Sequence, residues 1–281
     1  MNWQRTTALI GATFVTLVLA ISALLAPSIA AGGLLHPSRR HLTTPIPGNC
    51  ENVLFKGVDV DLKGWKCSGK GGNRGTIVYL HGVADNRASA SGVIERFTSK
   101  GFDVVAYDSR AHGESEGQTC TYGYLEKQDL RRVIDTLGVP SVVLIGTSLG
   151  AAIALQAAAD DARIALVVAA EAFSDLRTIA RERAPYFLTG WFLRQSFSVA
   201  EHRGRFEVDR VSPVTAAGRI KVPVLLIHGD NDRETTPDHS QRVLDALGGP
   251  KRLLLVKGAG HNESLRSSGV WEEIDRWVVS R

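Results

Sequence analysis

The sequence has few cysteines, and none of them is arranged as a metal ligand or a redox pair. The three cysteines are Cys50, Cys67 and Cys120. No two of them form a Cys-x-x-Cys motif, and their spacing is unlike that of paired zinc ligands. We therefore expect no metal site built on sulfur. In an exported domain two of these cysteines can form a disulfide, whereas in a reducing cytosol all three are buried thiols. The sequence does not select the pair.

The chain also lacks any tract in which charge of one sign is concentrated. It carries 33 basic and 29 acidic residues, a formal net charge of +4, and the two signs are interspersed. This pattern argues against a nucleic-acid partner and is typical of a mildly basic, solvated surface. With 281 residues, of which 44% are hydrophobic, the chain is long enough for one catalytic domain with a large core and a small appendage.

The longest stretch without charge lies near the N-terminus. Residues 6–35 contain no charged side chain, and residues 8–26 are apolar apart from Gly, Thr and Ser. This length is sufficient to cross a bilayer, and a globular helix would show a polar face. We therefore predict that residues 1–35 form a membrane anchor with a single transmembrane helix. The enzyme domain that follows is expected to be extracytoplasmic. The alternatives are a signal peptide cleaved near residues 28–30, which would give a secreted protein, and a buried core helix.

The rest of the chain has the pattern of an α/β domain. Residues 36–51 contain three prolines among polar residues and are expected to form a linker, and residues 52–281 are expected to form the folded domain. Apolar strand candidates lie at 53–60, 76–80, 102–107, 142–145, 164–169, 222–227 and 253–256. Because helical stretches separate most of them, we predict a mostly parallel central sheet with helices on both faces and ligands at the carboxyl ends of its strands.

One interval breaks this alternation of strands and helices. Residues 174–218 contain no strand candidate, but they contain helical stretches and a group of aromatic residues. These aromatics are Tyr186, Phe187, Trp191, Phe192 and Phe197. We predict a helical lid inserted above the sheet. Its aromatic side chains either line an acyl pocket or pack the insertion onto the domain, and the sequence favours neither alternative.

The strongest local motif is Gly-Thr-Ser-Leu-Gly at residues 146–150. It follows the apolar run 141–145 and precedes a helical stretch of small residues at 151–159. A Gly-x-Ser-x-Gly motif at a strand-to-helix turn is typical of a nucleophilic serine, because the tight turn leaves no room for side chains at the glycine positions. The motif predicts Ser148 as the nucleophile, provided that an acid and then a histidine follow at later strand ends.

Both partners are present in the required chain order. The strand candidate 222–227 is followed by two aspartates, Asp230 and Asp232, and the strand candidate 253–256 is followed by His261. We predict that His261 takes the proton of the serine hydroxyl and returns it to the leaving group, and that a carboxylate orients its ring. Both aspartates are candidates for this acid, because a turn can also satisfy a carboxylate through backbone amides.

The tetrahedral intermediate of acyl transfer also needs two backbone N–H donors. Leu149, directly after the predicted nucleophile, supplies the first donor, and Val83, after the strand candidate 76–80, supplies the second. His81 and His228 each lie beside a glycine at a strand end. We interpret both as structural histidines, held by packing or hydrogen bonds.

From about residue 53 to the C-terminus the chain resembles the α/β-hydrolase superfamily. The segments that carry the resemblance are 80–82, 108–110, 112–115, 146–150, 228–232 and 260–262. The arrangement is similar to membrane-anchored or secreted serine hydrolases, among them lysophospholipases, monoacylglycerol lipases and acyl-protein thioesterases. The resemblance selects Asp232 as the acid, supports Val83 as a donor and implies no metal and no organic cofactor. Ala111 stands where the family commonly has a glycine.

The resemblance also implies the reaction. It predicts a serine hydrolase that cleaves a carboxylic ester, a thioester or a lipid acyl bond through an acyl-enzyme on Ser148, with a small molecule or a lipid as substrate. Serine at this position argues against the branches that use aspartate, the haloalkane dehalogenases and epoxide hydrolases. A serine peptidase or amidase and a non-catalytic binding protein of the same fold are the alternatives. The oligomeric state is not predicted.

Overall fold

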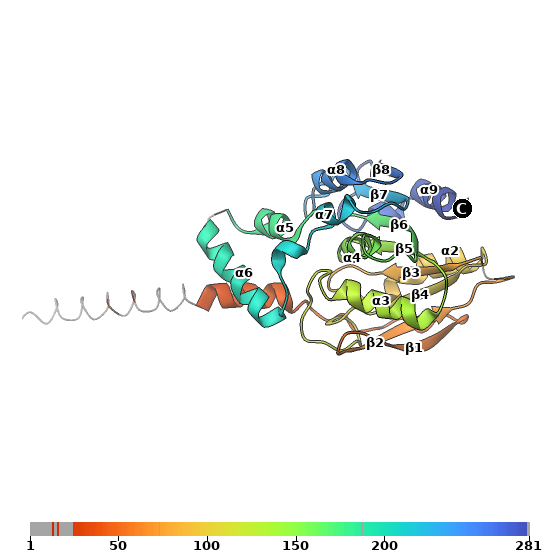
Figure 1. Cartoon of the computed structure of the whole chain (residues 1–281), viewed down its shortest axis with the longest axis horizontal. Helices are drawn as coiled ribbons and strands as arrows, with labels where there is room; N and C mark the ends of the chain where they lie inside the picture. The colour runs from red at the N-terminus through yellow and green to blue at the C-terminus, as the bar shows by residue number, and fades with distance from the viewer. Residues whose placement is uncertain (1–12, 14–15, 17–24, 73, 187, 280–281) are drawn as a thin grey trace, which may run out of the picture.

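The computed structural model describes residues 13, 16, 25–72, 74–186 and 188–279. Within these residues, eight strands form one sheet in the order β1-β2-β4-β3-β5-β6-β7-β8 (Figure 1). The strands are β1 (Cys50–Lys56), β2 (Asp61–Cys67), β3 (Thr76–Leu80), β4 (Asp103–Tyr107), β5 (Val142–Thr147), β6 (Ile164–Ala170), β7 (Val224–Gly229) and β8 (Lys251–Val256). Neighbouring strands from β4 to β8 are parallel, which confirms the predicted mostly parallel sheet.

Helices cover both faces of this sheet. Most of one face packs against α3 (Glu126–Leu137), α4 (Leu149–Ala158) and α8 (Pro237–Ala246). The other face packs against α2 (Ser91–Thr98) and α9 (Ser268–Val279). Because both faces are covered, the central strands are buried on both sides, which explains their nearly continuous apolar sequences.

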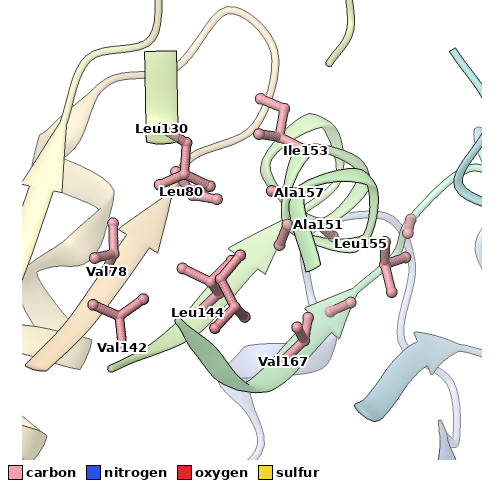
Figure 2. Packing of buried hydrophobic residues seen from close by; sticks show 14 of the residues in the cluster. Val78, Leu80, Leu130, Val142, Leu144, Ala151, Ile153, Leu155, Ala157 and Val167 are labelled. Carbon is pink, nitrogen blue, oxygen red and sulfur yellow. The ribbon is translucent and has the colours of Figure 1, made fainter. Parts of the chain in front are cut away.

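The packing of α4 on the sheet fixes the position of the residues around the strand ends. Its side chains Ala151, Leu155 and Ala157 lie close to strands β5 and β6, where Leu144 and Val167 face them (Figure 2). Small alanine side chains allow the helix to approach the sheet closely, and the apolar contacts drive the association. The start of α4 is therefore held against the carboxyl ends of the central strands.

Strand β2 is the one strand of the described sheet that the sequence did not predict. It pairs antiparallel with β1 and with β4 at the edge of the sheet. Because β2 lies near that edge, it can carry the exposed side chains of Lys63 and Lys66, and it therefore lacks a continuous apolar run. Cys50 and Cys67 lie opposite each other in the β1-β2 register and form a disulfide, whereas Cys120 is a buried free thiol.

The prediction of a transmembrane helix, and with it a membrane-anchored enzyme, is wrong. Among the residues that the structure describes, no helix is both long enough and apolar enough to span a bilayer. Residues 25–35 are helical, and their side chains Ala31 and Leu35 are buried in a cluster with Phe197 and Ala200. This part of the expected anchor thus packs on protein. Most of residues 1–24, on which the anchor and signal-peptide hypotheses also depended, lie outside the described residues.

The segment after that helix runs along the loops at the carboxyl edge of the sheet. The Arg39 guanidinium donates hydrogen bonds to backbone carbonyls, the shortest at 2.6 Å to Ser115 and Gly117. The Asn86 side-chain amide donates to the Arg40 carbonyl at 3.0 Å. These contacts bring the N-terminal segment beside the loop that follows β3.

Candidate active site

The serine of the Gly-x-Ser-x-Gly motif lies at a sharp turn between β5 and α4. Ser148 has a φ of 48° and a ψ of −112°, which is unusual for a residue with a side chain. A Cβ atom on Gly150 would lie 2.0 Å from the Leu80 carbonyl oxygen, and one on Gly146 would lie 2.5 Å from the Gly150 carbonyl oxygen. The turn therefore requires glycine at both positions, and it presents the serine hydroxyl above the sheet.

The structure brings Ser148, His261 and Asp232 together at the ends of β5, β8 and β7. His261 Nδ1 lies 2.7 Å from Asp232 Oδ2, and His261 Nε2 lies 3.1 Å from Ser148 Oγ. The other carboxylate oxygen of Asp232 accepts hydrogen bonds from the backbone N–H groups of Glu234 and Thr235, each at 2.9 Å. The carboxylate is thus fixed behind the ring, and Nε2 is directed at the serine hydroxyl.

The electrostatics of this group suit proton transfer. Burial raises the pKa of Asp232, but hydrogen bonds from His228 and His261 outweigh it and hold that pKa well below its usual range. Burial lowers the pKa of His261, but the hydrogen bond and charge of Asp232 outweigh it, so the pKa of this imidazole is raised. The carboxylate therefore stays ionised while the imidazole is a stronger base than usual.

The second candidate acid lies elsewhere in the same turn. The Asp230 carboxylate is exposed and accepts a hydrogen bond of 2.6 Å from the Gly258 backbone N–H. His228 is buried; its Nε2 donates to the Thr235 carbonyl at 2.7 Å and lies 3.3 Å from Asp232 Oδ2. Thus Asp232, and not Asp230, meets the histidine of the site, and His228 supports that carboxylate from behind.

The two predicted backbone donors flank the serine. Leu149 is the first residue of α4, so its N–H has no partner within the helix. In the loop after β3, a Cβ atom on Gly82 would lie 3.6 Å from Ser148 Cβ, and Val83 follows directly. His81 fixes this loop, because its Nδ1 donates to the Gly82 carbonyl at 2.7 Å and its Nε2 accepts from the Ser109 N–H at 3.0 Å.

A cavity of about 440 Å³ opens beside this group. Its lining includes Gly82, Thr147 and Asn262, which neighbour the serine or the histidine in space or in sequence. Arg40 from the N-terminal segment and Trp271 from α9 also line it. The cavity therefore lies on the α2-α9 side of the strand ends.

The described residues of the insertion 174–218 do not line this cavity. The insertion contains α5 (Leu176–Arg183), α6 (Gly190–Gly204), a 3-10 turn (Val208–Arg210) and α7 (Pro213–Ala217). Helices α5 and α6 lie with the helix of residues 25–35 at one end of the molecule, away from α9 (Figure 1). Phe197 is buried between these elements, whereas Tyr186 and Trp191 are exposed and Phe187 lies outside the described residues. Phe197 thus packs the insertion onto the domain.

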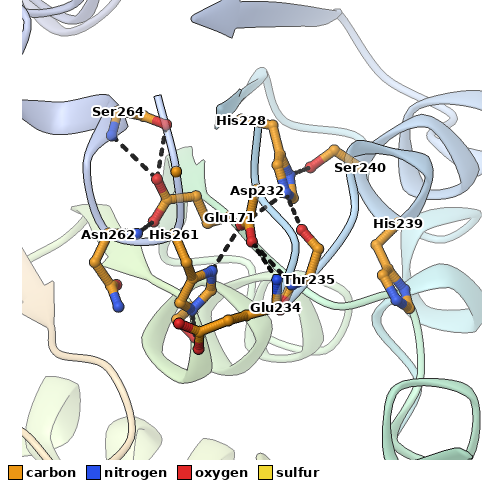
Figure 3. A network of polar contacts seen from close by, with 12 residues as sticks. Glu171, His228, Asp232, Glu234, Thr235, His239, Ser240, His261, Asn262 and Ser264 are labelled. Carbon is orange, nitrogen blue, oxygen red and sulfur yellow. Dashed lines mark hydrogen bonds and ion pairs between the residues drawn. The ribbon is translucent and has the colours of Figure 1, made fainter. Parts of the chain in front are cut away.

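Sequence reasoning missed Glu171, which directly follows β6. Its carboxylate is buried and accepts hydrogen bonds from the backbone N–H groups of Asn262 and Ser264, the first and third residues after His261 (Figure 3). The available signal was a single carboxylate at the end of an apolar strand, where parallel sheets place functional groups.

Sequence reasoning also missed a second contact chain of serine, histidine and carboxylate. Ser174 Oγ lies 2.8 Å from His239 Nδ1, and His239 Nε2 lies 2.8 Å from Glu182 Oε2. Burial outweighs the hydrogen bond from Glu182, so the pKa of His239 is lowered. Neither this cluster nor any other group of His, Cys, Asp and Glu in the described residues is arranged to hold a metal ion.

Comparison with known proteins decides the family. A model described as alpha/beta hydrolase fold matches residues 75–211, and a model described as TAP-like protein matches residues 201–280. The uncharacterized protein YqkD of Bacillus subtilis is 30% identical over 219 residues, which cover 74% of this chain and 72% of YqkD. The chain belongs to the alpha/beta hydrolase superfamily. The predicted superfamily and fold are thereby confirmed.

Solved structures place this hydrolase among esterases and related enzymes by fold. The esterase Pf2001 of Pyrococcus furiosus matches with a TM-score of 0.69 and 25% identity, covering 88% of this chain and 96% of the esterase. The acylaminoacyl peptidase of Pyrococcus horikoshii matches with a TM-score of 0.62 and 20% identity, covering 81% of this chain but only 41% of the peptidase. The esterase is therefore similar over nearly its whole length, whereas the peptidase shares one part.

Proposed function

We propose that this hydrolase is a serine hydrolase that cleaves a carboxylic ester through an acyl-enzyme on Ser148. The observation that carries the proposal is the pair of hydrogen-bond distances, 3.1 Å and 2.7 Å, that links Ser148, His261 and Asp232 beside a cavity lined by their neighbours Thr147 and Asn262. A hydroxyl is a weak nucleophile until a neighbouring base accepts its proton, and this arrangement supplies that base.

The geometry supports a two-step reaction. Ser148 Oγ attacks the carbonyl carbon of the ester while His261 Nε2 takes the hydroxyl proton, and the carbonyl oxygen becomes an oxyanion that accepts hydrogen bonds from the N–H groups of Leu149 and Val83. The imidazolium then gives its proton to the leaving alcohol as the ester C–O bond breaks. In the second step His261 takes a proton from water, whose oxygen attacks the acyl carbonyl carbon. The imidazolium then returns that proton to Ser148 Oγ as the acyl C–O bond to the serine breaks and the acid is released. Asp232 remains ionised throughout and stabilises the imidazolium.

The cavity supports a small substrate over a long-chain lipid. Its volume of about 440 Å³ is at the lower end of the roughly 300–1,000 Å³ of small-molecule sites. The walls combine polar side chains, such as Tyr79 and Asp85, with apolar ones, such as Val93 and Trp271. We expect kcat/KM for p-nitrophenyl esters to be higher with acetate or butyrate than with palmitate. A maximum at palmitate would favour a lysophospholipase-like or monoacylglycerol-lipase-like activity instead, and a preference for acyl-thioesters would favour a thioesterase.

The first test of the proposal is covalent labelling of the proposed nucleophile. A fluorophosphonate probe should add once to the folded protein, as detected by intact-mass measurement, and Ser148→Ala should remove the adduct. Ser174→Ala is the matched control, because it alters the other serine that contacts a histidine, and it should keep the adduct. No adduct on folded parent protein, or an adduct that survives Ser148→Ala, would contradict the proposal.

The remaining alternatives are separated by the choice of substrate. The same group of residues can cleave amides when the leaving nitrogen is protonated, so a strong preference for peptide anilides over p-nitrophenyl esters would favour a peptidase. Ester hydrolysis that His261→Ala leaves unchanged would favour a non-catalytic binding protein whose background activity arises elsewhere.

A further inference from the structure

We propose that Glu171 is a positioning residue for this reaction, whose carboxylate holds the loop that carries His261 in its working geometry. The inference rests on the proposed function and extends it to a residue outside the Ser148-His261-Asp232 group. Three observations carry it: the fixed backbone of Glu171, the direction of all its carboxylate hydrogen bonds, and its uncompensated charge.

The backbone of Glu171 is held in a conformation that residues with side chains rarely adopt. Its φ is 60°, in the left-handed region, and its N–H donates a hydrogen bond of 2.8 Å to the Ile227 carbonyl on β7. Left-handed backbone at a residue other than glycine costs on the order of 1 kcal/mol and persists only where surrounding contacts enforce it. The side chain is 1% exposed, so the turn after β6 directs a carboxylate inward and not into solvent.

Every hydrogen bond that this carboxylate makes in the described structure goes to the loop after β8. Oε2 accepts from the Asn262 N–H at 2.6 Å, and Oε1 accepts from the Ser264 N–H at 3.1 Å and from its hydroxyl at 2.7 Å (Figure 3). Asn262 itself has a left-handed φ of 61°, so the chain turns sharply immediately after His261. Glu171 therefore stabilises the bend that directs the imidazole.

The loop is held on both sides of His261, and Glu171 provides the second side. Before the histidine, the Ala259 carbonyl accepts a hydrogen bond of 3.0 Å from the Asn231 N–H. A Cβ atom on Gly229 would lie 2.2 Å from that carbonyl oxygen, so the loop fits closely against the end of β7. After the histidine, the contacts to Glu171 fix the loop against the end of β6. Without the contacts to Glu171, the His261 ring would be held only by the loop contacts before it and by its hydrogen bond to Asp232.

The charge of Glu171 adds an electrostatic contribution to this mechanical one. Within the described residues, no Lys, Arg or His nitrogen lies within 4 Å of its carboxylate, and its donors are neutral. The charges that raise the pKa of His261 come from Asp232 first, then from Glu171 and Glu234. Because the imidazolium forms only during the reaction, the buried charge of Glu171 favours that transient state.

The test compares Glu171→Gln with Glu126→Gln. Glu126 is a matched control because it is also buried and accepts three hydrogen bonds, from the Thr121 N–H, the Thr121 hydroxyl and the Gly123 N–H, each at 2.7 Å, at the start of α3. We expect Glu171→Gln to lower kcat by about 10- to 100-fold, since misplacement of a reacting group by about 1 Å has that effect. The acidic limb of kcat/KM against pH should also move to lower pH, because one negative charge beside His261 is removed. Glu126→Gln should lower the melting temperature but leave kcat and the limb unchanged.

A Glu171→Gln variant that melts earlier, but retains the parent kcat and pH profile, would overturn the proposal. If this variant does not fold, Ser264→Ala replaces it, because it removes one hydrogen bond and keeps the charge. Ser264→Ala should then lower kcat several-fold with the acidic limb unmoved, and an unchanged kcat would overturn the proposal. A parent protein that neither hydrolyses esters nor binds the fluorophosphonate would instead contradict the proposed function, so the two failures are distinguishable.

Discussion

Two hydrogen-bonded groups in the described part of this hydrolase, Ser148-His261-Asp232 and Ser174-His239-Glu182, each join a serine, a histidine and a carboxylate, and a cavity of about 440 Å³ opens beside the first. In the first, Ser148 and Asp232 lie 3.1 Å and 2.7 Å from the ring nitrogens of His261. In the second, Ser174 and Glu182 each lie 2.8 Å from those of His239. The serine–histidine distance is shorter in the second group, and the histidine–carboxylate distance is slightly shorter in the first, so distance alone does not separate them. The difference between them must therefore lie in what surrounds each ring.

The second histidine already uses the lone pair that a base needs. His239 Nδ1 accepts a hydrogen bond of 3.0 Å from the Ser174 backbone N–H, and the Ser174 hydroxyl donates a hydrogen bond of 3.0 Å to Asp175 Oδ2. Ser174 and His239 are both fully buried. Ser148, by contrast, lies at a strained turn beside a cavity and helix N–H groups. A hydrogen-bonded chain becomes a reactive site only when the base is free to accept the hydroxyl proton and a substrate can reach the oxygen.

Replacement of the two serines gives the largest expected difference. Ser148→Ala should lower kcat for p-nitrophenyl acetate by about 10⁶-fold, the scale seen when a catalytic serine is removed. Ser174→Ala should leave kcat close to the parent value, because its hydroxyl has no access to substrate. Steady-state kinetics on both variants, with melting temperatures as a folding control, decide the comparison. Equal losses would show that distance was the better guide.

Replacement of the two carboxylates should also lower kcat unequally, but by a smaller factor than replacement of the two serines. Asp232→Asn keeps the shape of the site but favours the wrong tautomer of His261, so we expect a loss of about 10⁴-fold in kcat. Glu182→Gln alters the partner of His239 and should change kcat little. The check is the ratio of kcat values at a pH above the acidic limb. If Glu182→Gln lowered kcat as much as Asp232→Asn, both groups would be required for the reaction, which contradicts the comparison.

The pH profile tests the opposite pKa shifts of the two histidines. Only neutral imidazole can accept the serine proton, and the pKa of His261 is raised by Asp232 against the effect of burial. Activity should therefore fall as pH decreases through a value above the ordinary 6.5 of histidine. His239→Gln should not move this limb. A limb centred below the ordinary value, or one displaced by His239→Gln, would show that the pKa shifts are assigned to the wrong histidines.

The smallest expected effect is on the pH dependence of stability. Because the pKa of His239 is lowered, the unfolded chain binds its proton first, and stability is lost as pH falls below 6.5. Because the pKa of His261 is raised, its contribution is present below 6.5 and is lost as pH rises through the folded value. Urea unfolding of His239→Gln and His261→Gln across this range should show slopes that change in opposite directions.

The sequence was most informative about features that depend on neighbouring residues in the chain, such as a buried strand or a tight turn. The central strands are buried on both faces, so their apolar runs were visible, whereas β2 is interrupted by the exposed Lys63 and Lys66 and was missed. The serine turn was visible because Gly146 and Gly150 have no room for a side chain. Ala111, where the family commonly has glycine, has a left-handed φ of 61°. The turn is therefore retained with the smallest side chain available.

The sequence was least informative about contacts between residues that are distant in the chain. It also did not distinguish an apolar helix that spans a membrane from one that packs on protein. Glu171 contacts residues 91 and 93 positions later, and no local pattern connects them. His239 lies 65 positions after Ser174 and 57 positions after Glu182, so no local pattern connects these residues either. The apolar N-terminal segment predicted a membrane span, but residues 25–35 pack against α6, because an apolar helix is stabilised by a protein surface as well as by lipid.

Trapping of the acyl-enzyme is a direct test of Ser148 as the nucleophile. The parent protein would be mixed with p-nitrophenyl acetate, quenched in acid within the first turnover, digested and analysed by mass spectrometry. We predict an acetyl group on the peptide that contains Ser148, and its loss in Ser148→Ala. Acetylation of the peptide that contains Ser174, or rapid ester hydrolysis with no acetylated serine at any quench time, would contradict it.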